Sequence, residues 1–124
     1  MESFFSSSRR VVYGIALLIV VAGAVGSVFA AQQRALTAEE AYVSNQLANK
    51  SCLSDWGINE GVGVGEGSTT GVTVGGVRVA VTLPYAYTTE TDEGTVYADS
   101  ISHAVYAVTA TDVHRISGDR ISIC

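Results

Sequence analysis

The sequence has little positive charge, and the cations it has are dispersed. Seven Lys and Arg residues stand against 12 Asp and Glu in 124 residues, and Lys50 is the only lysine. From residue 32 onward, five basic residues face eleven acidic ones. Phosphate binding needs Lys and Arg clustered on one face of a protein. We therefore expect no nucleic-acid partner.

The sequence also lacks the residue patterns of an active site. Its two histidines, His103 and His114, have no third ligand at a spacing that suits a metal. No nucleophile turn or oxyanion loop is recognisable. Residues 57–71 are rich in glycine, but they contain neither a dinucleotide-binding spacing nor a Gly-Lys-Ser/Thr motif. We expect no catalytic residues, metal, cofactor or small-molecule substrate, and so no enzyme.

One long apolar run is present, from Val11 to Ala31, with 21 residues and no charge. As a helix it covers about 30 Å, the thickness of the hydrocarbon core of a bilayer. Arginines at residues 9–10 precede it, so the positive-inside rule places the N-terminus in the cytoplasm and the rest of the chain outside. We expect a single-pass protein of the cell membrane.

A cleaved secretory signal is the alternative interpretation of this run, with cleavage after Ala30. Both interpretations place the remaining chain on the same side of the membrane. Small residues within the run recur at a spacing that lets a second helix approach closely. We expect contacts with membrane lipid and with other transmembrane helices in a homo- or hetero-oligomer, through Ala22, Gly23, Gly26, Ser27 and Ala30.

The predicted fold class is α+β, a long N-terminal transmembrane helix followed by a small antiparallel β-sheet domain that is pilin-like or a β-sandwich. The remaining length suffices for one small domain. The chain divides into a cytoplasmic N-terminus (1–10), a transmembrane helix (11–31), a helical extension (32–51), a glycine-rich connector (52–71) and an antiparallel β domain (72–124).

The helical extension has an apolar stripe, because Leu36, Val43 and Leu47 recur at helical spacing. Residues 37–40 match a capping box, so the helix either bends near Leu36 and restarts or runs on as one rod. The β domain is the surface that this stripe would cover.

Hairpin signals follow. Gly75 and Gly76 predict a two-residue turn that pairs Val72 with Val79. Pro84 then ends the strand, bends it or places it at an edge. Residues 91–94 predict a second turn.

Candidate modification and contact sites lie in the outward part. Cys52 and Cys124 predict a disulfide worth about 4 kcal/mol, with intermolecular pairing or two free thiols as alternatives. Asn49 begins a glycosylation motif. A candidate interaction surface consists of Tyr85, Tyr87 and Tyr97.

The order of parts resembles type IV pilin-like proteins and small single-span archaellum or pilus accessory proteins of archaea. The shared features are basic residues, a hydrophobic helix entering at Val11, an extension to about Lys50, an antiparallel sheet and a closing cysteine at Cys124. This resemblance implies a non-enzymatic, membrane-anchored structural or assembly protein of the cell envelope. The alternative is an anchored or secreted adhesin-like binding domain.

Overall fold

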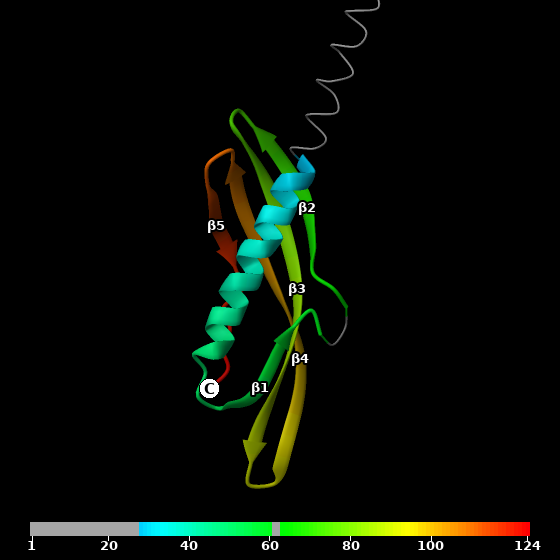
Figure 1. Cartoon of the computed structure of the whole chain (residues 1–124), viewed down its shortest axis with the longest axis vertical. Coiled ribbons are helices and arrows are strands. Elements are labelled where there is room, and N and C mark those ends of the chain that lie inside the picture. Colours follow the sequence, from blue (N-terminus) through cyan, green and yellow to red (C-terminus); the bar gives the residue numbers. More distant parts are fainter. Residues whose placement is uncertain (1–27, 61–62) are drawn as a thin grey trace, which may run out of the picture. The chain divides into compact units, whose positions relative to one another are not determined.

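A helix and an antiparallel sheet make up the described part of the chain, which comprises residues 28–60 and 63–124 of a computed structural model (Figure 1). The helix covers residues 28–48 without a break. The sequence left open whether the helix bends and restarts near Leu36 or continues through it. In the structure it continues through Leu36. Thr37 lies inside the helix and caps nothing, because the buried side of the helix continues in register on both sides of it.

Five strands lie between residues 53 and 118 of the described part. Their bounds are β1 Leu53–Ile58, β2 Glu66–Thr73, β3 Gly76–Thr91, β4 Gly94–Thr109 and β5 Val113–Gly118. All pairings are antiparallel, in the order β1-β3-β4-β5, and β2 also pairs with β3. The long strands β3 and β4 pair along their whole length, from Gly76 opposite Thr109 to Thr91 opposite Gly94. The predicted antiparallel sheet is confirmed.

Pro84 lies within the central strand β3, where a proline normally breaks the pairing. β2 pairs with β3 only as far as Thr82, and β1 begins its pairing at Tyr85. The two short strands thus share one side of β3 and leave a gap at Pro84. The Pro84 carbonyl accepts a hydrogen bond from Asn59 N at 2.8 Å, so the backbone of Pro84 faces this gap. Proline has no backbone N–H, but no strand pairs with Pro84 on this side, so no hydrogen bond of the sheet is lost.

One stripe of the helix forms its contact with the sheet. Its members recur every four residues, which places them on one side of a helix, and each is at most 5% exposed: Ala31, Ala35, Glu39, Val43 and Leu47. Alternate residues of β3 and β4 face the stripe, as the pleat requires. The largest of these are Val79, Val81, Leu83, Tyr85, Tyr106 and Val108.

The fold class predicted from the sequence is wrong in its main element. The described structure is mostly antiparallel β-sheet with one helix of residues 28–48, in place of a long N-terminal transmembrane helix followed by a β domain. Within residues 28–60 and 63–124, no helix has both the length and the apolar character needed to cross a bilayer. The helix that is seen packs one side against the sheet and carries charged residues such as Arg34 and Glu40. Residues 11–27 of the predicted span lie outside the described residues.

Two of the strands occupy the segment predicted to be a glycine-rich connector, residues 52–71. Two of its glycines, Gly65 and Gly67, allow close packing against the helix. A Cβ on Gly67 would lie 3.1 Å from the backbone oxygen of Gln32, and one on Gly65 would lie 2.8 Å from Leu36 Cδ1. Glycine here lets β2 and the loop before it lie close to the helix. The glycine content of this segment predicted a turn-rich connector. In the structure, these two glycines stand in extended chain because larger residues would collide with the helix.

The β2–β3 hairpin is present, but its turn lies one residue earlier than predicted. Val74 and Gly75 form the turn, and Val72 pairs with Val77. Gly75 has a φ of 91°, whereas Gly76 is the first residue of β3. A Cβ at Gly76 would lie 3.0 Å from the Val108 carbonyl oxygen, so the second glycine allows β4 to approach closely.

Candidate functional site

A buried carboxylate lies at the middle of the interface between helix and sheet. Glu39 is 0% exposed and stands in the helix stripe between Ala35 and Val43. Those two neighbours belong to separate apolar clusters, Ala35 to the one that contains Val81 and Val43 to the one that contains Leu83. A buried charge is costly unless it is paired and hydrogen-bonded. The groups around Glu39 therefore decide whether the helix can lie on this sheet.

Four hydrogen bonds satisfy the Glu39 carboxylate. Ser102 Oγ donates to Oε1 at 2.8 Å, and Tyr106 Oη donates to Oε2 at 2.6 Å. Arg115 donates from Nε to Oε2 at 3.1 Å and from Nη2 to Oε1 at 3.2 Å, a two-point ion pair. Ser102 and Tyr106 come from β4 and Arg115 from β5. We call these four residues the Glu39 clamp, because they attach the helix to two strands.

Arg115 has contacts beyond Glu39. Its guanidinium lies 4.0 Å from the centroid of the Tyr42 ring, and Nη2 also donates to the Asp119 carbonyl at 2.9 Å. Burial acts to lower the pKa of Arg115, but the hydrogen bonds and the charge of Glu39 outweigh it and raise that pKa. The cation is thus held by a carboxylate, an aromatic face and a carbonyl, the three kinds of partner that a guanidinium uses best.

Tyr106 donates its phenol proton in a hydrogen bond to Glu39. Burial is the largest cause that raises the pKa of its phenol, followed by the hydrogen bond to Glu39 and the negative charge of Glu39. Both oxygens of Glu39 are occupied, and no buried side-chain polar atom in the described ranges lacks a hydrogen-bond partner. The clamp therefore satisfies both carboxylate oxygens of Glu39 within the fold.

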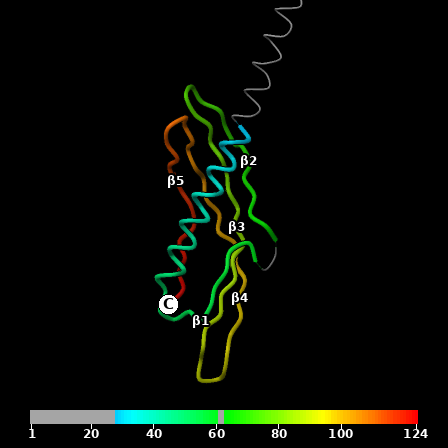
Figure 2. Tube along the Cα trace, in the orientation of Figure 1, coloured from blue at the N-terminus to red at the C-terminus, as the bar shows by residue number. Residues whose placement is uncertain are grey.

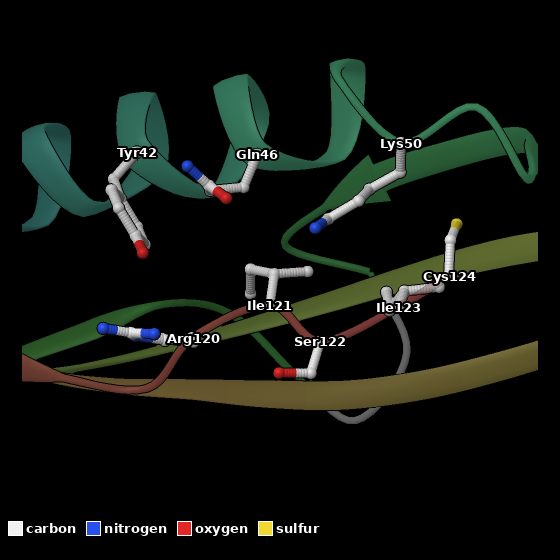
Figure 3. Close-up of a pocket in the computed structure, with 8 residues that line it drawn as sticks. All are labelled: Tyr42, Gln46, Lys50, Arg120, Ile121, Ser122, Ile123 and Cys124. Atoms are coloured by element: carbon white, nitrogen blue, oxygen red, sulfur yellow. The ribbon is translucent and has the colours of Figure 1, made fainter.

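A groove opens beside the clamp, between the C-terminal half of the helix and the segment after β5 (Figure 3). Its volume is about 550 Å³. Tyr42 and Gln46 line it from the helix, Lys50 from the end of the helix, and residues 120–124 from the opposite wall. We call this hollow the basic groove. It adjoins the clamp directly, because the ring of Tyr42 also lies against Arg115.

Lys50 and Arg120 make the groove positive. Figure 3 shows the Lys50 ammonium pointing into the space between the helix and the C-terminal segment. Neither cation forms an ion pair with an acidic side chain of the described residues. The Gln46 amide and the Ser122 hydroxyl add hydrogen-bonding groups to the walls. This lining suits a carboxylate or another anion.

The disulfide predicted from the sequence is present between Cys52 and Cys124, whose Cα atoms are 5.9 Å apart. It joins the chain just after the helix to the segment that follows β5, which Figure 2 shows returning to the C-terminal end of the helix. Cys124 also lines the basic groove. The disulfide therefore holds the two walls of the groove together at one end.

No family model, curated protein or solved structure matches this chain. The contacts within the chain are thus the basis for proposing a function. Two arrangements stand out, the Glu39 clamp and the basic groove. Within the described ranges, no group of three or more His, Cys, Asp or Glu side chains is placed to hold a metal ion.

The three tyrosines of the predicted interaction surface do not come together. Tyr85 is 6% exposed and belongs to the core. Tyr87 is half-buried and stacks on Tyr85, with ring centroids 6.2 Å apart. Tyr97 is 80% exposed and pairs with Thr88, which places it on the opposite face of the sheet from Tyr87. The alternation of strand residues separates Tyr97 from the other two.

The remaining predicted site residues have separate outcomes. Asn49 is exposed at the end of the helix, beside Asn45, a position open to modification. Ala30 is exposed on the helix. Four of the predicted helix-packing residues lie outside the described residues, namely Ala22, Gly23, Gly26 and Ser27.

The members of the clamp were not identified from the sequence. A signal was nevertheless present, because Glu39 stands four residues from Ala35 and four from Val43, on the same helical stripe. Likewise, Ser102 lies between two exposed residues of β4 and Tyr106 between two half-buried ones, the alternation of a strand with one buried face. A charged residue within an apolar stripe is therefore the feature that points to a buried ion pair.

Proposed function

We propose that this chain is a non-enzymatic structural or assembly protein of the cell envelope, a pilin-like subunit or pilus accessory protein. The uncharged sequence of residues 11–31 supports attachment to the cell membrane, with the sheet outside the cell, or secretion if the chain is cut after Ala30. Residues 1–10 would then lie in the cytoplasm. No chemistry beyond binding is needed for this role.

The observation that carries the proposal is the rigid attachment of the helix to the sheet. Its buried stripe runs from Ala31 to Leu47, the Glu39 clamp fixes the middle, and the disulfide fixes the chain just beyond the end. The N-terminal part adds Gln32, which donates to Thr69 at 3.0 Å, and Arg34, which donates to the Thr109 carbonyl at 2.6 Å. A subunit held in an assembly by its N-terminal segment needs such a connection to transmit load to its outer domain.

Photo-crosslinking in native membranes tests this role. A chain with a single lysine offers few sites for amine crosslinkers, so a photoreactive amino acid is placed at exposed positions, Val72, Tyr97 or Ile116. At least one position is expected to give a ladder of multimers or a complex with a partner. Placement at the buried Tyr85 is the matched control and should give no intermolecular product. Only monomer from every exposed position would contradict the proposal.

An adhesin-like binding domain is the second candidate, and one surface feature favours it. A hollow of about 220 Å³ is lined by Tyr97, Asp55 and Asp99, which the strand register places on one face of the sheet. Tyrosine is enriched among the residues that contribute most to binding at protein interfaces, and Tyr97 is 80% exposed. Tyr97→Ser should then abolish capture of a partner at an unchanged melting temperature, whereas the same change in an assembly subunit would leave capture intact.

A further inference from the structure

We propose that the basic groove binds the acidic β3–β4 turn of a second copy of this chain. The inference rests on the proposed assembly function and names the partner of the groove. The turn carries Glu90, Asp92 and Glu93, all exposed. One copy would thus supply the anion and the next copy the cations.

Two of the few positively charged residues of the chain line the groove. The chain from residue 32 onward has five cations against eleven acidic residues, yet Lys50 and Arg120 line the same hollow. Arg115, by contrast, is already engaged by Glu39. With no acidic partner from the described residues, the two groove cations are available to an external carboxylate. Such a site disfavours nucleic acid, because the net negative charge of the domain repels a long polyanion.

The acidic turn is placed to reach another molecule. β1 pairs with β3 only as far as Thr89, and β5 pairs with β4 only as far as Ala104. The end of the β3–β4 hairpin therefore has no neighbouring strand, and Figure 1 shows it projecting beyond the rest of the sheet. A narrow, negatively charged projection and a positively charged hollow on the same molecule are complementary surfaces for self-association.

The partly enclosed position of Lys50 makes the pairing more effective than an open surface contact. The Lys50 ammonium points between the helix and the C-terminal segment, where the Tyr42 ring and Ile121 provide apolar walls. Partly buried pairs are screened by salt less than exposed ones. Even so, a contact built on a few charges is weak in solution. It becomes effective when copies are held at high local concentration, as membrane attachment would do.

Charge reversal in the full-length protein, solubilised in detergent, tests the inference. The groove variant is Lys50→Glu with Arg120→Glu, and the turn variant is Asp92→Lys with Glu93→Lys. Each alone is expected to weaken self-association at least tenfold in sedimentation equilibrium. An equimolar mixture of the two variants should recover association, because each then offers the charge that the other needs. The matched controls are Arg78→Glu and Glu66→Lys, exposed reversals elsewhere on the sheet that should leave association unchanged.

The outcomes separate this inference from the proposed function. The groove assignment alone is overturned if the groove variant associates as tightly as the wild type. It is also overturned if Arg78→Glu weakens association as much as the groove variant does. The photo-crosslinked ladder would then persist in membranes carrying the groove variant, and the assembly function would stand. A mixture that does not recover association also overturns the assignment, provided that thermal melting shows both variants folded. Wild-type protein that never associates and gives no crosslinked product contradicts the proposed function itself.

Discussion

Replacing Arg115 with methionine is the most informative perturbation of this domain. The change keeps an apolar stem of similar length and removes the cation. Glu39 would retain hydrogen bonds from Ser102 and Tyr106 but would be a buried charge with no counter-ion. Removing one member of a buried ion pair costs about 3–5 kcal/mol. Because the Arg115 side chain is 20% exposed, water can partly replace it, and we expect the lower end, about 3 kcal/mol.

Thermal unfolding under oxidising conditions measures this effect. For a domain of this size, each 1 kcal/mol shifts Tm by about 4–8 °C, so the expected fall is about 12 °C or more. Arg78→Met is the matched control, an exposed arginine whose loss should change stability by less than about 0.5 kcal/mol. The ring of Tyr42 lies against Arg115, and Tyr42→Leu reports this separate contribution, about 0.5–2 kcal/mol.

A second substitution distinguishes an unpaired charge from lost packing. Adding Glu39→Leu to Arg115→Met leaves no buried charge, and such replacements are often neutral or stabilising. The double variant should therefore regain most of the stability that the single variant loses. The reasoning would be refuted if Arg115→Met cost less than about 1 kcal/mol, the range of a surface ion pair. A double variant no more stable than the single one would refute it equally.

Three further perturbations follow from the packing, the disulfide and the clamp. Gly67→Ala should lower the stability by about 1–3 kcal/mol, because the new Cβ would lie 3.1 Å from the Gln32 backbone oxygen. Gly71→Ala is the matched control, since its Cβ meets only Arg78 Cβ at 3.9 Å. Equal melting temperatures of the two variants would contradict this. Replacing Cys52 and Cys124 together with serine should lower the free energy of unfolding by about 4 kcal/mol, because the disulfide closes a loop with a sequence separation of 72 in the unfolded chain. A loss below about 1 kcal/mol in a urea titration would contradict this explanation. The pKa of Tyr106 is raised above 10.0, so the folded state holds this proton more tightly, and stability should fall as pH rises above about 10, by up to about 1.4 kcal/mol per pH unit. Tyr106→Phe should reduce that slope, and an identical alkaline slope in the variant would exclude the phenol as its source.

The features predicted correctly are those that local pattern or covalent chemistry determines. Two cysteines in a segment predicted to lie outside the cell indicated the Cys52–Cys124 disulfide, and alternating valines with glycine turns indicated an antiparallel sheet. The details that failed depend on distant neighbours. Which glycine of the pair forms the turn, for example, depends on how closely β4 approaches Gly76. Pro84 is tolerated only because two different strands meet β3 on either side of it.

Glu39 was the hardest residue to interpret from the sequence. Within the capping-box pattern of residues 37–40 it looks like an exposed acid near a helix start. Its partners lie between 63 and 76 residues further along the chain, on strands whose register the sequence leaves open. A β4 shifted by one residue would turn Ser102 and Tyr106 to the other face and leave Glu39 without both neutral donors.

A charge at the centre of an apolar stripe also explains how the helix selects one position on the sheet. The rest of the stripe is made of Ala, Val and Leu, whose apolar contacts are not directional. A slip of the helix by one turn moves Glu39 by about 5.4 Å, away from Arg115 and onto apolar side chains of one of the two clusters. The unpaired charge would then cost about as much as Arg115→Met. The clamp thus adds little net stability over an apolar core, but it penalises a helix that is shifted along the sheet.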